Sequence, residues 1–110
     1  MKNLLDKKCV PCEGGFPPFT PEEADKYKKE VSSDWEILED GKKIRRKFKF
    51  KDFKEAMRFV NKVSVVAEEE QHHPNIEIFY NIVNLTLWTH AIVGLSENDF
   101  IMAAKIDQIQ

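Results

Sequence analysis

Apolar and polar residues recur along the chain with two distinct periods, which indicates both strands and helices. In residues 43–50 every second side chain is apolar except Arg46, and the positions between are basic, as in a strand with one buried face. In residues 52–67 apolar side chains recur at steps of three and four, which predicts a helix packed on a sheet. The predicted inward face of this helix consists of Phe53, Ala56, Met57, Val60, Val63 and Ala67.

Capping residues mark the starts of three helices. At each start a Thr, Asp or Ser is followed three residues later by Glu or Asp, so that side chains bond the first backbone N–H groups. The helices are expected to begin at Thr20, Asp52 and Ser96, and the first is expected to run to about Val31. The inward-facing residues of the first and last helices are predicted to be Ala24, Tyr27, Val31, Ile101, Ala104 and Ile106.

Four short segments are predicted to be strands, the last two from their richness in Ile, Phe, Tyr, Val, Thr and Trp. Asp40-Gly41 supplies the positive φ angles of a tight turn between the first two, and Gly94 ends the sheet. The strands are expected at about residues 35–38, 43–50, 76–81 and 83–90. The order α-β-β-α-β-β-α predicts the α+β class, with a single four-stranded antiparallel sheet and helices packed on one face.

The length of 110 residues is that of one domain with a single hydrophobic core. Residues 1–19, punctuated by proline and glycine, are predicted to be an irregular arm, and residues 20–110 the folded domain. The N-terminus has no apolar core of signal-peptide length, and no segment approaches the roughly 20 apolar residues of a membrane span. We therefore expect a cytoplasmic protein that is not bound to a membrane.

The net charge of -2 provides no global attraction for nucleic acid or an anionic membrane. A local basic run within residues 42–51 is of the kind that a nucleic-acid-binding stripe would need. We interpret it instead as the solvent-exposed face of a strand, because Glu22, Glu23 and the acids at 68–70 offset it. No nucleic-acid partner is expected.

The two cysteines, Cys9 and Cys12, form a Cys-x-x-Cys pair within the arm. A structural zinc site needs four ligands, and the chain offers only one such pair. A thioredoxin-like redox pair follows a strand and opens a helix, whereas here two glycines and two prolines follow. We interpret the pair as part of a turn-rich arm with reduced thiols, and the sequence does not define its role.

All three histidines lie in one window, and histidine exchanges protons near neutrality because its unperturbed pKa is about 6.5. His72 and His73 are adjacent and are followed by Pro74, with His90 one hairpin away. Pro74 cannot continue the preceding helix, so the pair is expected just past the helix C-terminus. Because a helix C-terminus favours a cation, this position suits proton-transfer chemistry.

The order and spacing of these residues resemble the pterin-4a-carbinolamine dehydratase family, also called 4a-hydroxytetrahydrobiopterin dehydratases. That family has a Glu, three further residues, His-His-Pro, an aromatic residue, a further His and an Asp. The matching residues here are Glu68, His72, His73, Pro74, Tyr80, His90 and Asp99. The resemblance implies a hydro-lyase that dehydrates 4a-hydroxytetrahydropterin to quinonoid dihydropterin in tetrahydrobiopterin recycling, with no metal or organic cofactor.

Expelling the pterin 4a-hydroxyl requires one acid for the leaving oxygen and one base for the N5 proton. The resemblance implies that His72 and His90 are this pair, and which of them is the acid is not defined. It also implies that His73 binds and orients the substrate. The identity of the physiological pterin is not defined either.

Six further residues are candidates for binding the substrate or supporting the histidines. Gln71 stands where mammalian-type sequences have an acid, and it can still donate and accept hydrogen bonds. Tyr80 and Trp88 either stack on the flat pterin or belong to the core, and Asp99 either caps the last helix or orients a histidine. The complete set is Glu68, Gln71, Pro74, Tyr80, Trp88 and Asp99.

The resemblance further implies a homodimer or a tetramer, and a functional link to an aromatic amino acid hydroxylase. A dimer is favoured because bacterial members that carry a similar Cys-x-Pro-Cys-x-Gly-Gly arm are commonly dimeric. The edge strands of a four-stranded sheet also favour self-association.

Two alternatives to this enzyme are open. A dehydratase-like protein can act without catalysis, in protein binding or assembly or as a transcriptional cofactor. Relatives that assist Rubisco assembly lack the active-site histidines, whereas all three are present here. A metal site with His72, His73 and either Asp99 or Glu68 is disfavoured, because adjacent histidines on a turn chelate one ion poorly.

Overall fold

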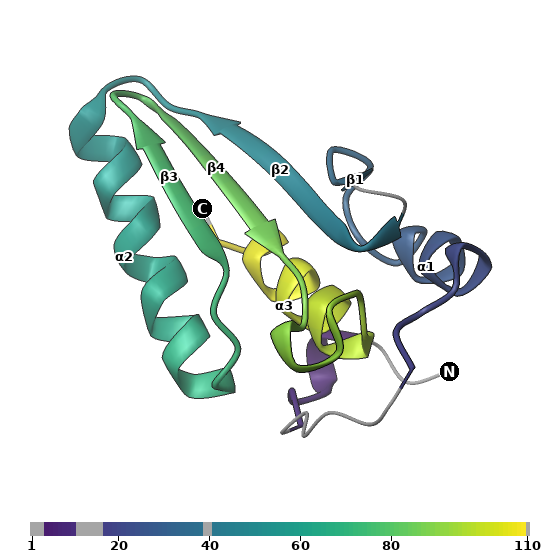
Figure 1. Cartoon of the computed structure of the whole chain (residues 1–110). Helices are drawn as coiled ribbons and strands as arrows, with labels where there is room; N and C mark the ends of the chain where they lie inside the picture. Colours follow the sequence, from purple (N-terminus) through teal and green to yellow (C-terminus); the bar gives the residue numbers. More distant parts are fainter. Residues whose placement is uncertain (1–3, 11–16, 39–40, 110) are drawn as a thin grey trace.

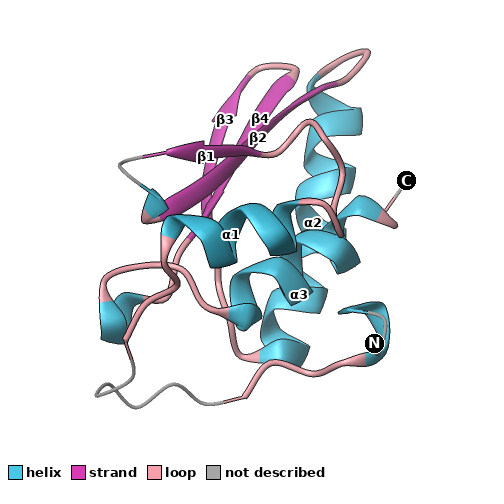
Figure 2. Cartoon of the chain, turned by 90° about the vertical axis from the view of Figure 1, so that its right-hand side faces the viewer, coloured by secondary structure: helices cyan, strands magenta, loops and turns pink. Residues whose placement is uncertain are grey.

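One antiparallel sheet, in the order β1-β2-β4-β3, contains the strands β1 (Glu36–Leu38), β2 (Lys43–Lys49), β3 (Asn75–Phe79) and β4 (Ile82–Leu87). The computed structural model describes residues 4–10, 17–38 and 41–109. Three α-helices lie on the same face of the sheet, which leaves the other face open (Figures 1 and 2). These are α1 (Pro21–Lys28), α2 (Phe53–Glu70) and α3 (Glu97–Asp107), with 3₁₀ turns η1 (Leu4–Asp6) and η3 (His90–Ile92). The predicted fold class is confirmed.

Local signals placed the helix starts correctly. Thr20 and Glu23 form the predicted capping box of α1, and the side chain of Asp52 accepts the Glu55 N–H at the start of α2. The predicted end of α1 near Val31 is wrong, since the helix ends at Lys28. No helix among the described residues is both long and apolar enough to cross a membrane.

The predicted inward face of α2 is correct at its centre and wrong at its first residue. Phe53 is 49% exposed, whereas Phe59, which was not predicted, is buried. The ring of Phe59 lies 4.6 Å from that of Phe48 and 5.1 Å from that of Phe50, between centroids. Phe59 therefore belongs to the buried face of α2, and Phe53 does not.

Helix α3 is buried more completely than its sequence predicted. Ile101, Ala104 and Ile106 face inward as expected, but Phe100 and Met102 are also fully buried. The reason is that α3 packs against α1, α2 and η1 at once. This central position places the first turn of α3 beside the end of α2.

Arg46, which interrupts the apolar face of β2, is held by an acid at the end of α3. Its Nη1 atom lies 2.6 Å from Oδ1 of Asp107, and the same carboxylate accepts the indole N–H of Trp35 at 2.8 Å. On the other side of β2, the side chains of Arg45, Lys47 and Lys49 are exposed, as the alternation predicted.

The segment predicted to be an irregular arm includes described residues that contact the domain. Leu4, in η1, is buried, and Cys9 and Phe19 pack partly against the core. Cys12 and Asp40, on which the Cys-x-x-Cys and hairpin-turn predictions depend, lie outside the described residues. Gly41 has the positive φ, +87°, that the turn prediction requires.

Candidate active site

The end of α2 presents the histidine pair. Gln71 has left-handed backbone angles (φ 53°, ψ 39°), and the His72 N–H donates to the carbonyl of Ala67 at 3.2 Å. This six-residue closure is a common helix ending, although glycine usually occupies the left-handed position. As Pro74 predicted, His72 and His73 follow the last helical turn directly.

His72 is paired with a buried acid. Its Nε2 atom lies 2.6 Å from Oδ1 of Asp99, whose side chain is completely buried in the first turn of α3. The other carboxylate oxygen, Oδ2, accepts the hydroxyl of Thr89 at 2.9 Å and the N–H of Ser96 at 3.0 Å. Asp99 therefore both caps α3 and contacts a histidine, so the two roles left open by the sequence are filled together.

We assign the hydrogen on the His72 ring from its contact with the Asp99 carboxylate. An ionised carboxylate only accepts hydrogen bonds, so Nε2 of His72 is the N–H donor to Asp99. Nδ1 is then the nitrogen that remains for a further partner. A histidine held in this way has a fixed tautomer and ring orientation.

His73 is paired with the acid one turn earlier in α2. Its Nε2 atom contacts Oε2 of Glu68, and both side chains are exposed to solvent. The side-chain N–H of Gln71 donates to the carbonyl of Glu68 at 2.7 Å. Exposed pairs of this kind contribute little to the stability of the fold.

His90 is held by stacking. It lies in η3, outside the strand where it was predicted, and its ring stacks on Trp88 with centroids 4.3 Å apart and planes at 14°. The ammonium of Lys43 lies 4.2 Å from the Trp88 centroid. The indole of Trp88 therefore contacts both the His90 ring and the Lys43 ammonium. In this structure Trp88 stacks on His90 and lines the pocket that contains this histidine.

The three histidines line one pocket of about 270 Å³. The turn that carries His90 is closed by a bridge in which the Thr89 N–H donates to the Gly94 carbonyl at 2.8 Å. The pocket is lined by Val10, Gln71, His72, His73, Trp88, Thr89, His90, Ala91 and Asn98. Residues from the arm, the end of α2, the end of β4 and the start of α3 thus meet at one place.

Tyr80, predicted near this site, lies elsewhere. It is 65% exposed in the turn between β3 and β4, whereas the histidine pair precedes β3. Five strand residues at about 3.3 Å each separate the two ends of β3. The structure therefore does not bring Tyr80 to the pocket, and its assignment to the core is also wrong.

Comparison with known proteins gives a consistent result over almost the whole chain. The model of the family described as pterin 4 alpha carbinolamine dehydratase matches residues 17–109. A Rickettsia canadensis protein named "Putative pterin-4-alpha-carbinolamine dehydratase" is 48% identical over 107 residues, which cover 97% of each chain. A protein of the same name from Alkaliphilus metalliredigens is 44% identical over 110 residues, which cover 100% of this chain and 98% of that one. The chain belongs to this family.

The fold of this chain is also similar to the folds of solved structures whose names include pterin dehydratase. A transcriptional coactivator/pterin dehydratase from Brucella melitensis has a TM-score of 0.75 and 35% identity, covering 81% of this chain and 94% of that one. A pterin dehydratase-like RuBisCO assembly factor of the alpha-carboxysome has a TM-score of 0.58 and covers 67% of this chain and 86% of that one. Its identity of 24% shows a shared fold and no more.

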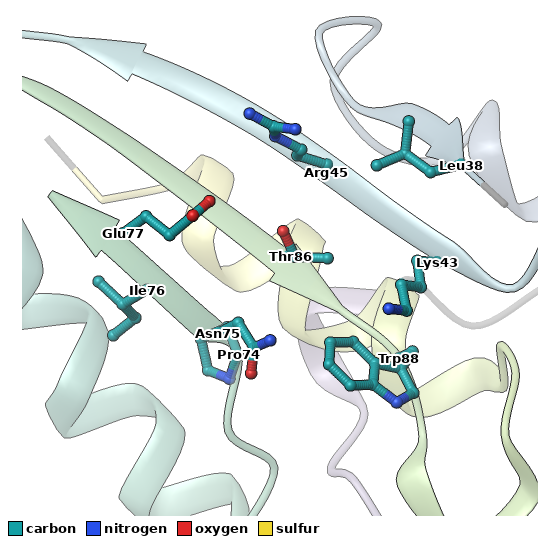
Figure 3. Close-up of a pocket in the computed structure, with 9 residues that line it drawn as sticks. All are labelled: Leu38, Lys43, Arg45, Pro74, Asn75, Ile76, Glu77, Thr86 and Trp88. Atoms are coloured by element: carbon teal, nitrogen blue, oxygen red, sulfur yellow. The ribbon is translucent and has the colours of Figure 1, made fainter. Parts of the chain in front are cut away.

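A second pocket, of about 600 Å³, lies on the open face of the sheet (Figure 3). It shares Trp88 with the histidine pocket but contains no histidine. Pro74, predicted to support the site, lines this second pocket. Its lining residues are Leu38, Lys43, Arg45, Pro74, Asn75, Ile76, Glu77, Thr86 and Trp88. Because all three histidines line the smaller pocket, that pocket is the candidate active site.

Sequence reasoning missed four residues that line this pocket, namely Val10, Thr89, Ala91 and Asn98. Thr89 bonds Asp99, and Asn98 and Val10 line the pocket. A threonine at a strand end and a valine in an arm carry no distinctive pattern, and Asn98 in the first turn of a helix was explained by its position alone. Only their contacts identify them.

The two adjacent histidines contact different acids. His72 contacts Asp99, and His73 contacts Glu68. Within the part of the chain that the structure describes, no group of three or more His, Cys, Asp or Glu side chains is placed to hold a metal ion. The alternative metal site with both histidines therefore has no shared centre among these residues.

Proposed function

We propose that the chain dehydrates a 4a-hydroxytetrahydropterin to a quinonoid dihydropterin by histidine acid–base catalysis. Membership of the family supports a pterin carbinolamine dehydratase activity. The observation that carries the mechanism is the meeting of all three histidines at one pocket, with one of them held by a fully buried carboxylate.

The reaction needs two proton transfers and no electron acceptor. The bond between C4a and the hydroxyl oxygen breaks, the oxygen takes a proton and leaves as water, and N5 loses its proton as the C4a–N5 double bond forms. His72 and His90 supply the acid and the base, each contributing about 10²–10⁴-fold. Exchange with solvent then returns both to their starting protonation states.

The supporting contacts fit this division of roles. Nε2 of His72 is committed to Asp99, so its proton transfer takes place through Nδ1, while the carboxylate compensates the charge of the protonated ring. The stack on Trp88 positions His90. His73, exposed and oriented by Glu68, is the residue that binds the substrate.

This activity belongs to the recycling of tetrahydrobiopterin beside an aromatic amino acid hydroxylase, which would produce the 4a-hydroxypterin. We further propose a cytoplasmic homodimer. These proposals rest on the family resemblance.

A second candidate is a binding protein, favoured by the description of the Brucella structure as a transcriptional coactivator as well as a pterin dehydratase. One assay separates the two. Quinonoid dihydropterin formation is followed from freshly generated 4a-carbinolamine with and without the purified protein. Acceleration above the spontaneous rate supports the enzyme, whereas an unchanged rate with correctly folded protein favours the binding role.

A further inference from the structure

Val10 of the N-terminal arm is bonded to Asn98 of α3, beside the histidine pocket. The Val10 N–H donates to Oδ1 of Asn98 at 3.0 Å, and Nδ2 of Asn98 donates to the Val10 carbonyl at 2.7 Å. Asn98 is buried, and its amide thus satisfies both backbone groups of one residue 88 positions away. Figure 1 shows this arm segment, in purple, next to the start of α3 and the turn that follows β4.

A buried glutamate at the end of α2 makes a second attachment. Oε1 of Glu70 accepts the Cys9 N–H at 2.8 Å, and Oε2 accepts the ammonium of Lys105 at 3.0 Å. Burial opposes ionisation of the Glu70 carboxyl, but the bonds from Cys9 and Lys105 outweigh it and hold its pKa below the usual range. The Glu70 carboxyl is therefore ionised near neutral pH.

A third contact holds the start of the same segment. The ammonium of Lys7 lies 2.7 Å from Oε2 of Glu97, which also accepts the hydroxyl of Tyr27 at 3.0 Å. Residues 7–10 are thus attached to α2 and α3 at three successive places. Such a segment has a defined position relative to the histidines.

Val10, at the end of this segment, borders the histidine pocket. Val10 lines the same pocket as His72 and His90, yet it is 67% exposed. An exposed β-branched apolar side chain among histidines and amides gains free energy when a flat heterocycle covers it. Because χ1 of valine is restricted, its side chain loses little conformational freedom when a ligand packs against it.

We propose that residues 7–10 form a wall of the pterin site, in which Val10 contacts the heterocycle and Asn98 is the positioning residue that holds it. The proposal rests on the proposed function, since it names how that substrate is bound. Neither Val10 nor Asn98 can exchange protons near neutrality, so the wall contributes to binding and not to proton transfer.

The test compares Asn98→Ala and Val10→Ala with a matched control, Asn81→Ala. Asn81 also donates its side-chain N–H to a distant carbonyl, that of Phe50 at 2.9 Å, but at the far end of the sheet. We expect Asn98→Ala to raise KM about tenfold and Val10→Ala about fivefold, with kcat within about twofold. The Kd for 7,8-dihydrobiopterin, read by tryptophan fluorescence, is expected to rise in parallel, and Asn81→Ala to leave KM and this Kd unchanged.

Hydrogen exchange reports whether the arm is attached. The Val10 amide is expected to be protected in the wild type and to exchange freely in Asn98→Ala, with other amides of α3 still protected. A fall in kcat at constant KM, or an equal rise of KM in Asn81→Ala, would overturn the proposal. So would an unchanged pterin affinity in a variant whose Val10 amide has lost protection.

The two proposals fail in different ways. If the wild type binds 7,8-dihydrobiopterin without accelerating dehydration, the proposed function is wrong. The affinities of the variants for this pterin still show whether residues 7–10 contribute to its binding. If the wild type is an active dehydratase and all three variants match it in KM, the wall is wrong and the proposed function stands.

Discussion

The Nε2 atom of His72 lies 2.6 Å from Oδ1 of Asp99, and Asp99 has no exposed surface. The second oxygen of Asp99 is committed to two donors, the hydroxyl of Thr89 and the backbone N–H of Ser96. The backbone N–H cannot accept a hydrogen bond, so the group facing it must be an oxygen. The same carboxylate therefore links the first turn of α3 to the imidazole of His72, and its orientation is set by the Ser96 N–H.

Asp99→Asn is predicted to reverse the tautomer of His72. The amide oxygen must stay on the Ser96 N–H, which turns the NH₂ group toward Nε2 and leaves the hydrogen on Nδ1. We expect kcat to fall about 10²–10⁴-fold with little change in KM, since geometry is kept while the proton carrier is wrong. Steady-state kinetics and circular dichroism check this. Asp52→Asn, a change of the same kind at the cap of α2, is the control. An Asp99→Asn rate within threefold of the wild-type rate would contradict the assignment of the hydrogen to Nε2 of His72.

His72→Ala and His90→Ala are each predicted to lower the dehydration rate about 10²–10⁴-fold. Folding should be largely kept, because both residues border an open pocket. The double variant should lose less than the product of the single losses, since the two groups act as one unit. His73→Ala should instead weaken pterin binding more than it slows turnover. A rate that survives loss of both His72 and His90 would exclude this mechanism.

Replacement of both cysteines by serine is predicted to leave the rate within about threefold, since no thiol enters the acid–base scheme. Cys9 is attached through its backbone N–H, which donates to Glu70, and through its thiol, which donates to the Asn98 carbonyl at 3.5 Å. Serine retains the first bond, and its hydroxyl is a donor for the second. Initial rates and metal analysis of the purified protein check this. A hundredfold loss, or stoichiometric zinc that disappears with the mutation, would revive the metal alternative.

The thiol of Cys9 is predicted to resist alkylation in the folded protein. Burial, followed by the negative charges of Glu70 and Asp99, raises its pKa to about 12. An acid whose pKa is raised by folding stabilises the fold below its unfolded pKa, and this stability is lost as the pH rises through about 12. In a Cys12→Ser background, iodoacetamide at pH 9 should react at least about tenfold more slowly with native than with urea-unfolded protein. Equal rates would contradict this burial.

Gly94→Ala is predicted to destabilise the protein by about 1–3 kcal/mol. A Cβ atom at this position would lie 2.5 Å from Cβ of Pro18. The ring of Pro18 cannot rotate away, and the next residue is held because the Phe19 N–H donates to the Leu95 carbonyl at 2.8 Å. Thermal unfolding should show a midpoint lower by several degrees. An unchanged midpoint would mean that this segment moves at no cost.

Dimerisation is predicted from the edges of the sheet. Strands β1 and β3 have one unpaired side each, and near β3 the exposed side chains of Phe79 and Tyr80 are apolar or aromatic. Light scattering at tens of micromolar should give twice the chain mass, and Phe79→Lys should weaken the association. A wild-type mass of 12.9 kDa would contradict the prediction.

The sequence by itself determined the element order, the starts of α1, α2 and α3, and the position of the histidine pair after α2. These features depend on hydrogen bonds between residues three or four apart, as between Asp52 and Glu55, and on the inability of Pro74 to continue a helix. The histidines of the candidate site could also be identified, because three histidines in one window are few enough to stand out.

Only the tertiary structure decided which groups meet. The pairing of His72 with Asp99 spans 27 residues and that of Val10 with Asn98 spans 88, and both depend on α3 packing at the centre of the helical layer. The same packing placed Trp88 beneath His90 and left Tyr80 at the far turn. Periodicity assigns a side chain to a face of its own element, whereas its partner is set by how separate elements pack against one another.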